Sequence, residues 1–237
     1  MSVNPDPIGK YVTVAMITKN EEQAVVGVIE DIKNIVPEAE ILIVDSSQDE
    51  TPVIAKAHGA KVIRQFPPRG YGPAMEHALR AASRPVIITL DCDNTYPAHK
   101  IPELASLILK ENYDLVDASR LEKKPQAMPW LNYLGNLTFA WLASLLFFRR
   151  LNDLHSGMRA YRKTMLDNLE FDAKGAALPV ELLLKPIISG YKVYTIFIDY
   201  HERVGQSKMN ALDTSWWTLK RILKVRMQSI KKNRLTL

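Results

Sequence analysis

Five short apolar runs alternate with helical patterns in the first half of the chain. The runs are rich in β-branched residues and have the length of buried strands: Tyr11–Thr18, Glu40–Val44, Lys61–Arg64, Pro85–Leu90 and Asp114–Ala118. Between them apolar residues recur at helical spacing, as at Ile29, Ile32 and Ile35. This alternation predicts an α/β fold built from βαβ units with right-handed crossovers, in which helices flank a mostly parallel twisted sheet.

The second half is less regular. Trp130–Phe148 is 19 residues long and contains no charged residue, which just reaches the lower range for a membrane span. Polar residues such as Asn132 and Asn136 interrupt it, so a core or interfacial helix is favoured over a span. Further strands are expected at 157–162 and 191–200, with a helix over 179–189 between them.

The last segment, from Ala211 to about Lys232, has a helical pattern. One row of apolar residues recurs at three- and four-residue steps: Leu212, Trp216, Leu219, Leu223, Met227 and Ile230. Lysines flank this row, which is typical of a helix that lies in a lipid interface. The alternative is a terminal helix that docks on the body of the protein.

Charge is unevenly distributed along the 237 residues. The net charge is +5, but residues 214–237 hold seven basic residues and no acidic one. The rest of the chain has a net charge of −2. Such a tail suggests an anionic partner, either a membrane surface or a nucleic acid. We therefore expect one domain over 1–210 and a basic amphipathic helix over 211–237.

The cysteine count and the N-terminal residues indicate the cellular compartment of the protein. Cys92 is the only cysteine, which excludes a disulfide framework and a zinc site built from cysteines, and favours a reducing cytoplasmic setting. Residues 1–10 contain no apolar signal-peptide core. The five histidines show no metal-ligand spacing and are expected at the surface or in packing.

Two aspartates follow the fourth predicted strand, in Leu90-Asp91-Cys92-Asp93-Asn94. In an open α/β sheet, ligands bind at the carboxyl ends of the strands where the strand order reverses. Two carboxylates there repel each other, and a divalent cation relieves that repulsion. Mg²⁺ takes one or two carboxylates and completes its shell with phosphate oxygens and water. A solvated loop or a helix cap is the simpler reading of such a motif taken alone.

Other polar residues occupy the same predicted edge of the sheet. Asp45 ends the second strand, Thr18-Lys19-Asn20-Glu21 ends the first, and Arg69-Gly70-Tyr71-Gly72 precedes a helix. Each alone has a structural explanation as a turn, a cap or a loop. Together with the aspartates they point to a site for a nucleoside diphosphate and a metal.

These segments resemble the family 2 glycosyltransferases of the GT-A fold, a Rossmann-like fold, and within them the dolichol-phosphate mannose synthase group. Six segments match in the family's order: Thr18–Glu22, Val44–Thr51, Arg69–Gly72, Asp91–Asp93, Asp153–Tyr161 and Arg203–Lys208. The last two are the specific ones, because they separate polyprenyl-phosphate sugar synthases from the wider superfamily. The resemblance covers roughly residues 11–210.

The resemblance implies roles for the matching residues. The donor nucleotide would be held by Thr18, Asn20, Glu22, Asp45, Arg69 and Gly70. Asp91 and Asp93 would bind Mg²⁺ or Mn²⁺ at the diphosphate, and Asp153 would lie near the transferred sugar as a third catalytic residue. Phosphate of donor or acceptor would be met by Arg203, Ser207 and Lys208. Glu181 matches an acidic position of less certain role.

The resemblance implies transfer of a hexose from a nucleotide sugar to a polyprenyl or dolichyl phosphate, with inversion at the sugar carbon. GDP-mannose is the first choice of donor and UDP-glucose the second. The basic tail and the lipid acceptor place the protein at the cytoplasmic face of a membrane, as a peripheral protein. One alternative is a family 2 glycosyltransferase that acts on a saccharide hydroxyl.

Two alternatives belong to other classes. A nucleotide-binding dehydrogenase needs G-x-G-x-x-G after the first strand, and Thr18–Glu22 contains no glycine. A nonenzymatic nucleic-acid-binding protein would use the basic tail. The Trp and Leu residues of the tail and the acidic balance of the body argue against that use, so no nucleic acid is expected as a partner.

Overall fold

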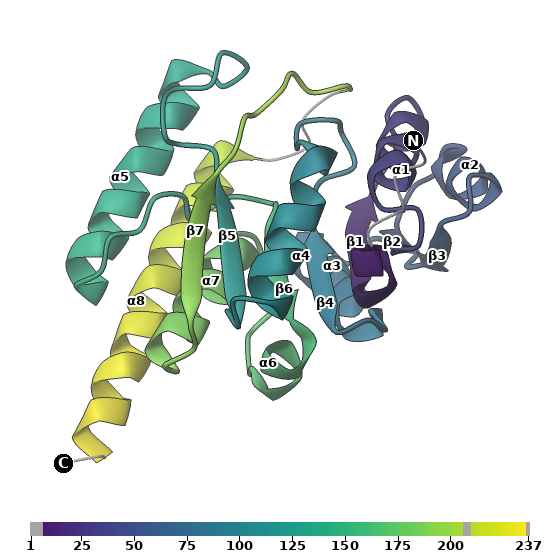
Figure 1. Cartoon of the computed structure of the whole chain (residues 1–237). Coiled ribbons are helices and arrows are strands. Elements are labelled where there is room, and N and C mark those ends of the chain that lie inside the picture. The colour runs from purple at the N-terminus through teal and green to yellow at the C-terminus, as the bar shows by residue number, and fades with distance from the viewer. Residues whose placement is uncertain (1–6, 206–209, 236–237) are drawn as a thin grey trace.

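A computed structural model describes residues 7–205 and 210–235 (Figure 1). Seven strands form one sheet in the order β3-β2-β1-β4-β6-β5-β7. They are β1 Val12–Thr18, β2 Glu40–Asp45, β3 Lys61–Arg64, β4 Val86–Thr89, β5 Leu115–Ser119, β6 Arg159–Arg162 and β7 Val193–Phe197. Only β6 is antiparallel to its neighbours β4 and β5. The predicted mostly parallel sheet is therefore confirmed.

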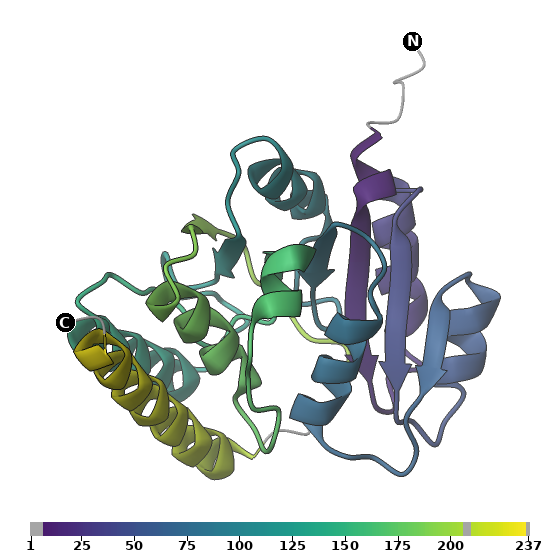
Figure 2. The same cartoon turned by 90° about the horizontal axis from the view of Figure 1, so that it is seen from below.

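Helices cover both faces of the sheet. They are α1 Val25–Ile35, α2 Thr51–Ala57, α3 Tyr71–Ala81, α4 Ile101–Leu109, α5 Trp130–Phe147, α6 Lys163–Asn168, α7 Leu178–Ile188 and α8 Ala211–Leu235. Two 3₁₀ turns, Pro7–Tyr11 and Ala98–Lys100, complete the description. Figures 1 and 2 show α5 and α8 side by side, beyond β7 at one end of the molecule.

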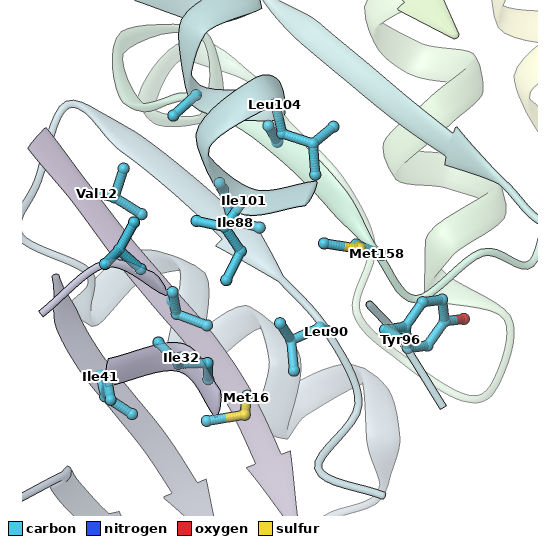
Figure 3. Close-up of a cluster of buried hydrophobic side chains, with 14 of the residues drawn as sticks. Val12, Met16, Ile32, Ile41, Ile88, Leu90, Tyr96, Ile101, Leu104 and Met158 are labelled. Atoms are coloured by element: carbon cyan, nitrogen blue, oxygen red, sulfur yellow. The ribbon is translucent and has the colours of Figure 1, made fainter. Parts of the chain in front are cut away.

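The sheet separates two hydrophobic cores, because alternate residues of each strand point to opposite faces. Met16 of β1 and Ile88 of β4 pack with Ile32 of α1 and with α4 on one face (Figure 3). Their neighbours in sequence, such as Ala15 and Ile87, pack on the other face against α3, α7 and α8. Burial on both faces explains why the strands appear as continuous apolar runs in the sequence.

Several element boundaries differ from the predictions. The first helix begins at Val25 and not at 20–22, because those residues form a loop braced against the next one. The strand expected at 157–162 begins at Arg159, since Gly157 and its neighbours lie against the β4 loop. The strand expected at 191–200 covers only Val193–Phe197. Helix α6 was not predicted.

Helix α8 has two different faces. Ile222 and Val225 are completely buried in the second core, so the helix packs on the body. The apolar row predicted from the sequence lies elsewhere on the helix: Leu219 is half-buried, and the other five members are exposed, namely Leu212, Trp216, Leu223, Met227 and Ile230. Among the described residues, no helix combines the length and apolar character needed to cross a membrane.

Candidate active site

Several of the predicted site residues lie where the carboxyl ends of β1, β2 and β4 meet. Strand β4 lies next to β1, while β2 and β3 follow on the opposite side of β1. The order of the sheet therefore reverses between β1 and β4, the position where open α/β sheets bind ligands. Thr18 ends β1, Asp45 ends β2, and Asp91 follows β4.

Asp45 ties three strands together at this edge. Its carboxylate is completely buried and accepts hydrogen bonds from the Thr18 hydroxyl at 2.6 Å and from the backbone N–H of Ser47 at 3.1 Å. The guanidinium of Arg64, at the end of β3, forms an ion pair with it. A buried carboxylate is stable only with such partners. Asp45 thus shapes the floor of the site.

Asn20 and Glu22 brace the loop after β1 against the loop after β2. Asn20 has a φ of 55°, a left-handed conformation that Asn tolerates better than most residues. Its side-chain oxygen accepts from the N–H of Gln48 at 2.8 Å. Glu22 accepts from the N–H of Glu50 at 3.3 Å. The two loops therefore form one wall.

Asp91 and Asp93 lie together after β4. Asp93 is buried and accepts two hydrogen bonds from Thr95, at 2.6 Å from the hydroxyl and 3.2 Å from the N–H. Burial raises the pKa of Asp91, and the negative charge of Asp93 adds to this effect, so that the pKa is about 7. Two carboxylates in this relation fit a divalent cation, which relieves their repulsion. The described residues include no group of three or more His, Cys, Asp or Glu that could hold a metal ion.

Arg203 joins the loops that follow β1 and β4. Its Nη1 lies 3.0 Å from Asp93 Oδ2 and its Nη2 lies 3.2 Å from Glu21 Oε1. The backbone N–H of Val204 donates to the carbonyl of Asp93 at 3.0 Å, which fixes this segment beside the aspartates. A cation is thereby placed at the edge of the candidate metal site. Ser207 and Lys208, predicted with Arg203, lie outside the described residues.

Asp153 is held by an arginine that sequence reasoning missed. Arg120, directly after β5, approaches the buried Asp153 carboxylate with Nε at 2.7 Å and Nη2 at 3.0 Å. Burial alone would raise the pKa of Asp153, but Arg120 and the N–H of His155 lower it to about 2. A carboxylate with this pKa stays ionised and is a poor proton acceptor. The two contacts instead suit Asp153 to hold the Arg120 side chain in position.

The segment that contains Asp153 also reaches Asp91. The N–H of Gly157 donates to the hydroxyl of Tyr96 at 2.7 Å. A Cβ at Gly157 would lie only 2.8 Å from Asp91 Oδ2, so the absence of a side chain lets the carboxylate lie against the backbone. Sequence reasoning missed Tyr96.

Arg69 and Gly70 lead into α3. Both are exposed, and Gly70 has a φ of 96°, which favours glycine. Tyr71, the first residue of the helix, lies close enough to Asp91 that the aspartate charge adds to burial in raising the pKa of the tyrosine. The glycine loop therefore leads into a residue that lies near Asp91.

Glu181 does not lie with these residues. It is completely buried on α7 and forms ion pairs with Arg221 of α8 and, at 3.0 Å, with Lys185. These contacts make it an anchor for α8.

Comparison with known proteins gives three findings. The family described as Glycosyl transferase family 2 matches residues 13–170. A dolichyl-phosphate hexose transferase of Haloferax volcanii is 44% identical over 198 residues, 83% of this chain and 86% of the relative. The low-salt glycan biosynthesis hexosyltransferase Agl6 of the same organism is 28% identical over 88% of this chain, which spans 52% of that relative.

Among solved structures, glucosyl-3-phosphoglycerate synthase from Mycobacterium tuberculosis, in complex with Mn²⁺, UDP and phosphoglyceric acid, has a TM-score of 0.72. It is 21% identical, and the match covers 93% of this chain and 80% of the other. At that identity the likeness establishes the fold, which is the predicted GT-A arrangement.

Proposed function

The chain belongs to glycosyl transferase family 2, and from this premise we propose that it transfers a hexose from a nucleotide donor to a polyprenyl or dolichyl phosphate, with inversion at the sugar carbon. One observation carries the proposal. Asp91 and Asp93 lie at the carboxyl end of β4, with the Arg203 guanidinium 3.0 Å from Asp93. The relative named dolichyl-phosphate hexose transferase supports the lipid acceptor.

Asp91 and Asp93 would hold Mg²⁺ or Mn²⁺ at the donor diphosphate. When bound, the metal supplies positive charge that stabilises the leaving diphosphate as its negative charge develops. The Mn²⁺ and UDP in the Mycobacterium structure support this role. Arg203 adds a side-chain cation at the same edge, and Arg69 lies on the loop that borders it.

The donor nucleoside would lie on the wall formed by the loops after β1 and β2. Thr18 and Asp45 form its floor, while Asn20 and Glu22 hold the loops together. Gly70 lets the backbone approach the diphosphate. GDP-mannose is our first choice of donor and UDP-glucose our second.

A phosphate acceptor agrees with the protonation state of the site. Its second pKa is about 6, so it is largely ionised at neutral pH and needs little help from a base. A hydroxyl acceptor would need a proton acceptor, and the pKa of Asp153 of about 2 makes that residue unsuitable. Asp153 would instead position Arg120 beside the transferred sugar. Arg203, Ser207 and Lys208 would contact phosphate.

The exposed face of α8 would bring the site to the membrane that holds the acceptor. A groove along this face is lined by apolar side chains such as Trp216, Leu223 and Met227, and by Lys220 and Lys231. Near an anionic leaflet each cation contributes about 1 kcal/mol. Helix α5 exposes further large apolar residues, including Trp141 and Leu145. The protein would thus be peripheral, at the cytoplasmic face.

A donor panel tests the proposal. Full-length protein is incubated with Mn²⁺ and radiolabelled GDP-mannose, UDP-glucose or UDP-N-acetylglucosamine, each with polyprenyl phosphate or with a saccharide acceptor. We expect one hexose donor to label the lipid. Label that enters only the saccharide would favour the alternative family 2 activity on a hydroxyl. Nucleotide binding without any transfer would contradict both.

A further inference from the structure

Helix α8 carries a second face that points into the protein. This inward face consists of Trp217, Thr218, Arg221, Ile222 and Val225 and differs from the exposed apolar row. Two of its members, Ile222 and Val225, are ordinary core residues. Trp217 and Arg221 instead contact one short segment, residues 172–176, that leads into α7.

Arg221 fixes the backbone of this segment. The side chain is 2% exposed and forms an ion pair with Glu181. Its Nε, Nη1 and Nη2 also donate to three backbone carbonyls, those of Ala176, Asp172 and Lys174, at 2.9, 2.8 and 2.9 Å. A buried charge is tolerated only when its donors are satisfied in this way. The planar fork of arginine therefore sets the path of residues 172–176.

Residues 172–176 are packed tightly between α8 and α3. On one side, a Cβ at Gly175 would lie 2.2 Å from Cζ2 of the Trp217 ring. On the other, a Cβ at Gly72 in the first turn of α3 would lie 1.9 Å from the carbonyl oxygen of Ala173. The segment thus transmits the position of α8 directly to the start of α3.

The start of α3 is also the end of the glycine loop. Arg69 and Gly70 precede it, and the charge of Asp91 acts on Tyr71, its first residue. We propose that Trp217 and Arg221 are positioning residues for the donor diphosphate, because they hold residues 172–176 against the first turn of α3. The inference rests on the proposed function, since it takes the glycine loop as part of the donor site.

Two tryptophans, Trp217 and Trp130, provide a matched pair of variants. Trp217→Ala removes the ring that rests on Gly175, and Trp217→Phe keeps a ring there. Trp130→Ala removes a similarly exposed indole from the first turn of α5. Donor kinetics are measured on the full chain with a short water-soluble polyprenyl phosphate and no vesicles, so that membrane binding does not enter the result.

We expect Trp217→Ala to raise the KM for the donor about tenfold, while kcat at saturating donor stays close to wild type, because loss of positioning weakens capture of the diphosphate. Trp217→Phe should recover most of the loss. Trp130→Ala should keep the wild-type donor KM. If Trp217→Ala does not give a folded protein, Arg221→Lys takes its place, since it keeps the charge and loses the fork. A folded variant with wild-type donor KM overturns the inference.

Amide hydrogen exchange separates this inference from the proposed function. Without any nucleotide, Trp217→Ala should speed exchange over residues 70–75 of the full chain, and Trp130→Ala should not. Unchanged exchange in Trp217→Ala overturns the inference even if transfer is observed. If wild-type protein transfers no sugar from any donor, the proposed function fails, and faster exchange in Trp217→Ala still supports the mechanical contact.

Discussion

The half-buried imidazole of His155, whose Nδ1 atom is buried, predicts a pH dependence of folding stability. Its Nε2 lies 2.7 Å from the hydroxyl oxygen of Thr218 on α8, and that hydroxyl donates to the carbonyl of Thr214 at 2.8 Å. Nε2 must therefore carry the proton of the neutral ring. The other nitrogen, Nδ1, is buried and has no hydrogen-bond partner among the described residues. Protonation would place a charged N–H there without an acceptor.

The magnitude follows from the shifted pKa. Burial, opposed by Asp153 and aided by Arg120 and Arg159, lowers the pKa of His155 from 6.5 to about 4. Between pH 7.5 and 5 the unfolded chain therefore takes up a proton that the folded chain does not. The stabilising contribution is fully present above pH 6.5 and is lost as the pH falls toward 4. By pH 5 the loss amounts to about 2 kcal/mol.

Urea unfolding at pH 7.5 and pH 5 measures this loss in wild type and in His155→Gln. The pKa of Asp91 is raised to about 7 and that of Asp117 to about 6. Both carboxyl groups therefore stabilise the folded state as the pH falls, and they do so in wild type and variant alike. The difference between the two proteins isolates His155. We expect wild type to lose about 2 kcal/mol more than His155→Gln. Thr218→Ser, which keeps the hydroxyl, should behave as wild type. Equal losses in wild type and His155→Gln would refute this reasoning.

Three further predictions concern the site. Asp91→Asn or Asp93→Asn should reduce turnover about 10²-fold or more with the fold intact, because the ligands of the metal are lost; full activity in EDTA would exclude the metal. Arg203→Ala should lower kcat/KM about tenfold or more, since charge-assisted contacts to phosphate are strong. Lys208→Ala should act in the same direction. Wild-type transfer by both variants would show that the motif has another role. Gly157→Ala should displace the Asp91 carboxylate and lower kcat about tenfold. Circular dichroism checks that this variant is folded. Unchanged kinetics in the folded variant would show that the loop adapts to the added methyl group.

The strands and the aspartates could be predicted from the sequence because their signals are local. β1, β2 and β4 are buried on both faces, so each is a continuous apolar run whose limits lie within one residue or two of the prediction. Asp91 and Asp93 are separated by one residue after such a strand, and their proximity needs no tertiary information.

The partners of these residues could not be predicted in the same way. Arg120 approaches Asp153 across 33 residues of sequence, and Arg221 meets Glu181 across 40. No local period reveals such a pair. The tail shows the limit most clearly: its apolar row marks the exposed face, whereas the docked face includes a buried arginine and Thr218. A pattern of apolar residues cannot identify a face that is held by a charged side chain.

The chemistry of the transfer product tests the central claim most directly. Full-length protein is incubated with Mn²⁺ and tritiated GDP-mannose or UDP-glucose, either with polyprenyl phosphate or, in a parallel reaction, with a saccharide acceptor. The lipid extract is treated with mild acid. Mild acid releases a sugar joined to phosphate, because phosphate is a good leaving group, while a glycoside of a hydroxyl survives. We predict that the label enters the lipid and that mild acid releases it. The Asp93→Asn variant should form no labelled lipid. Label that resists mild acid, or that never enters the lipid while a saccharide acceptor is labelled, would contradict the account.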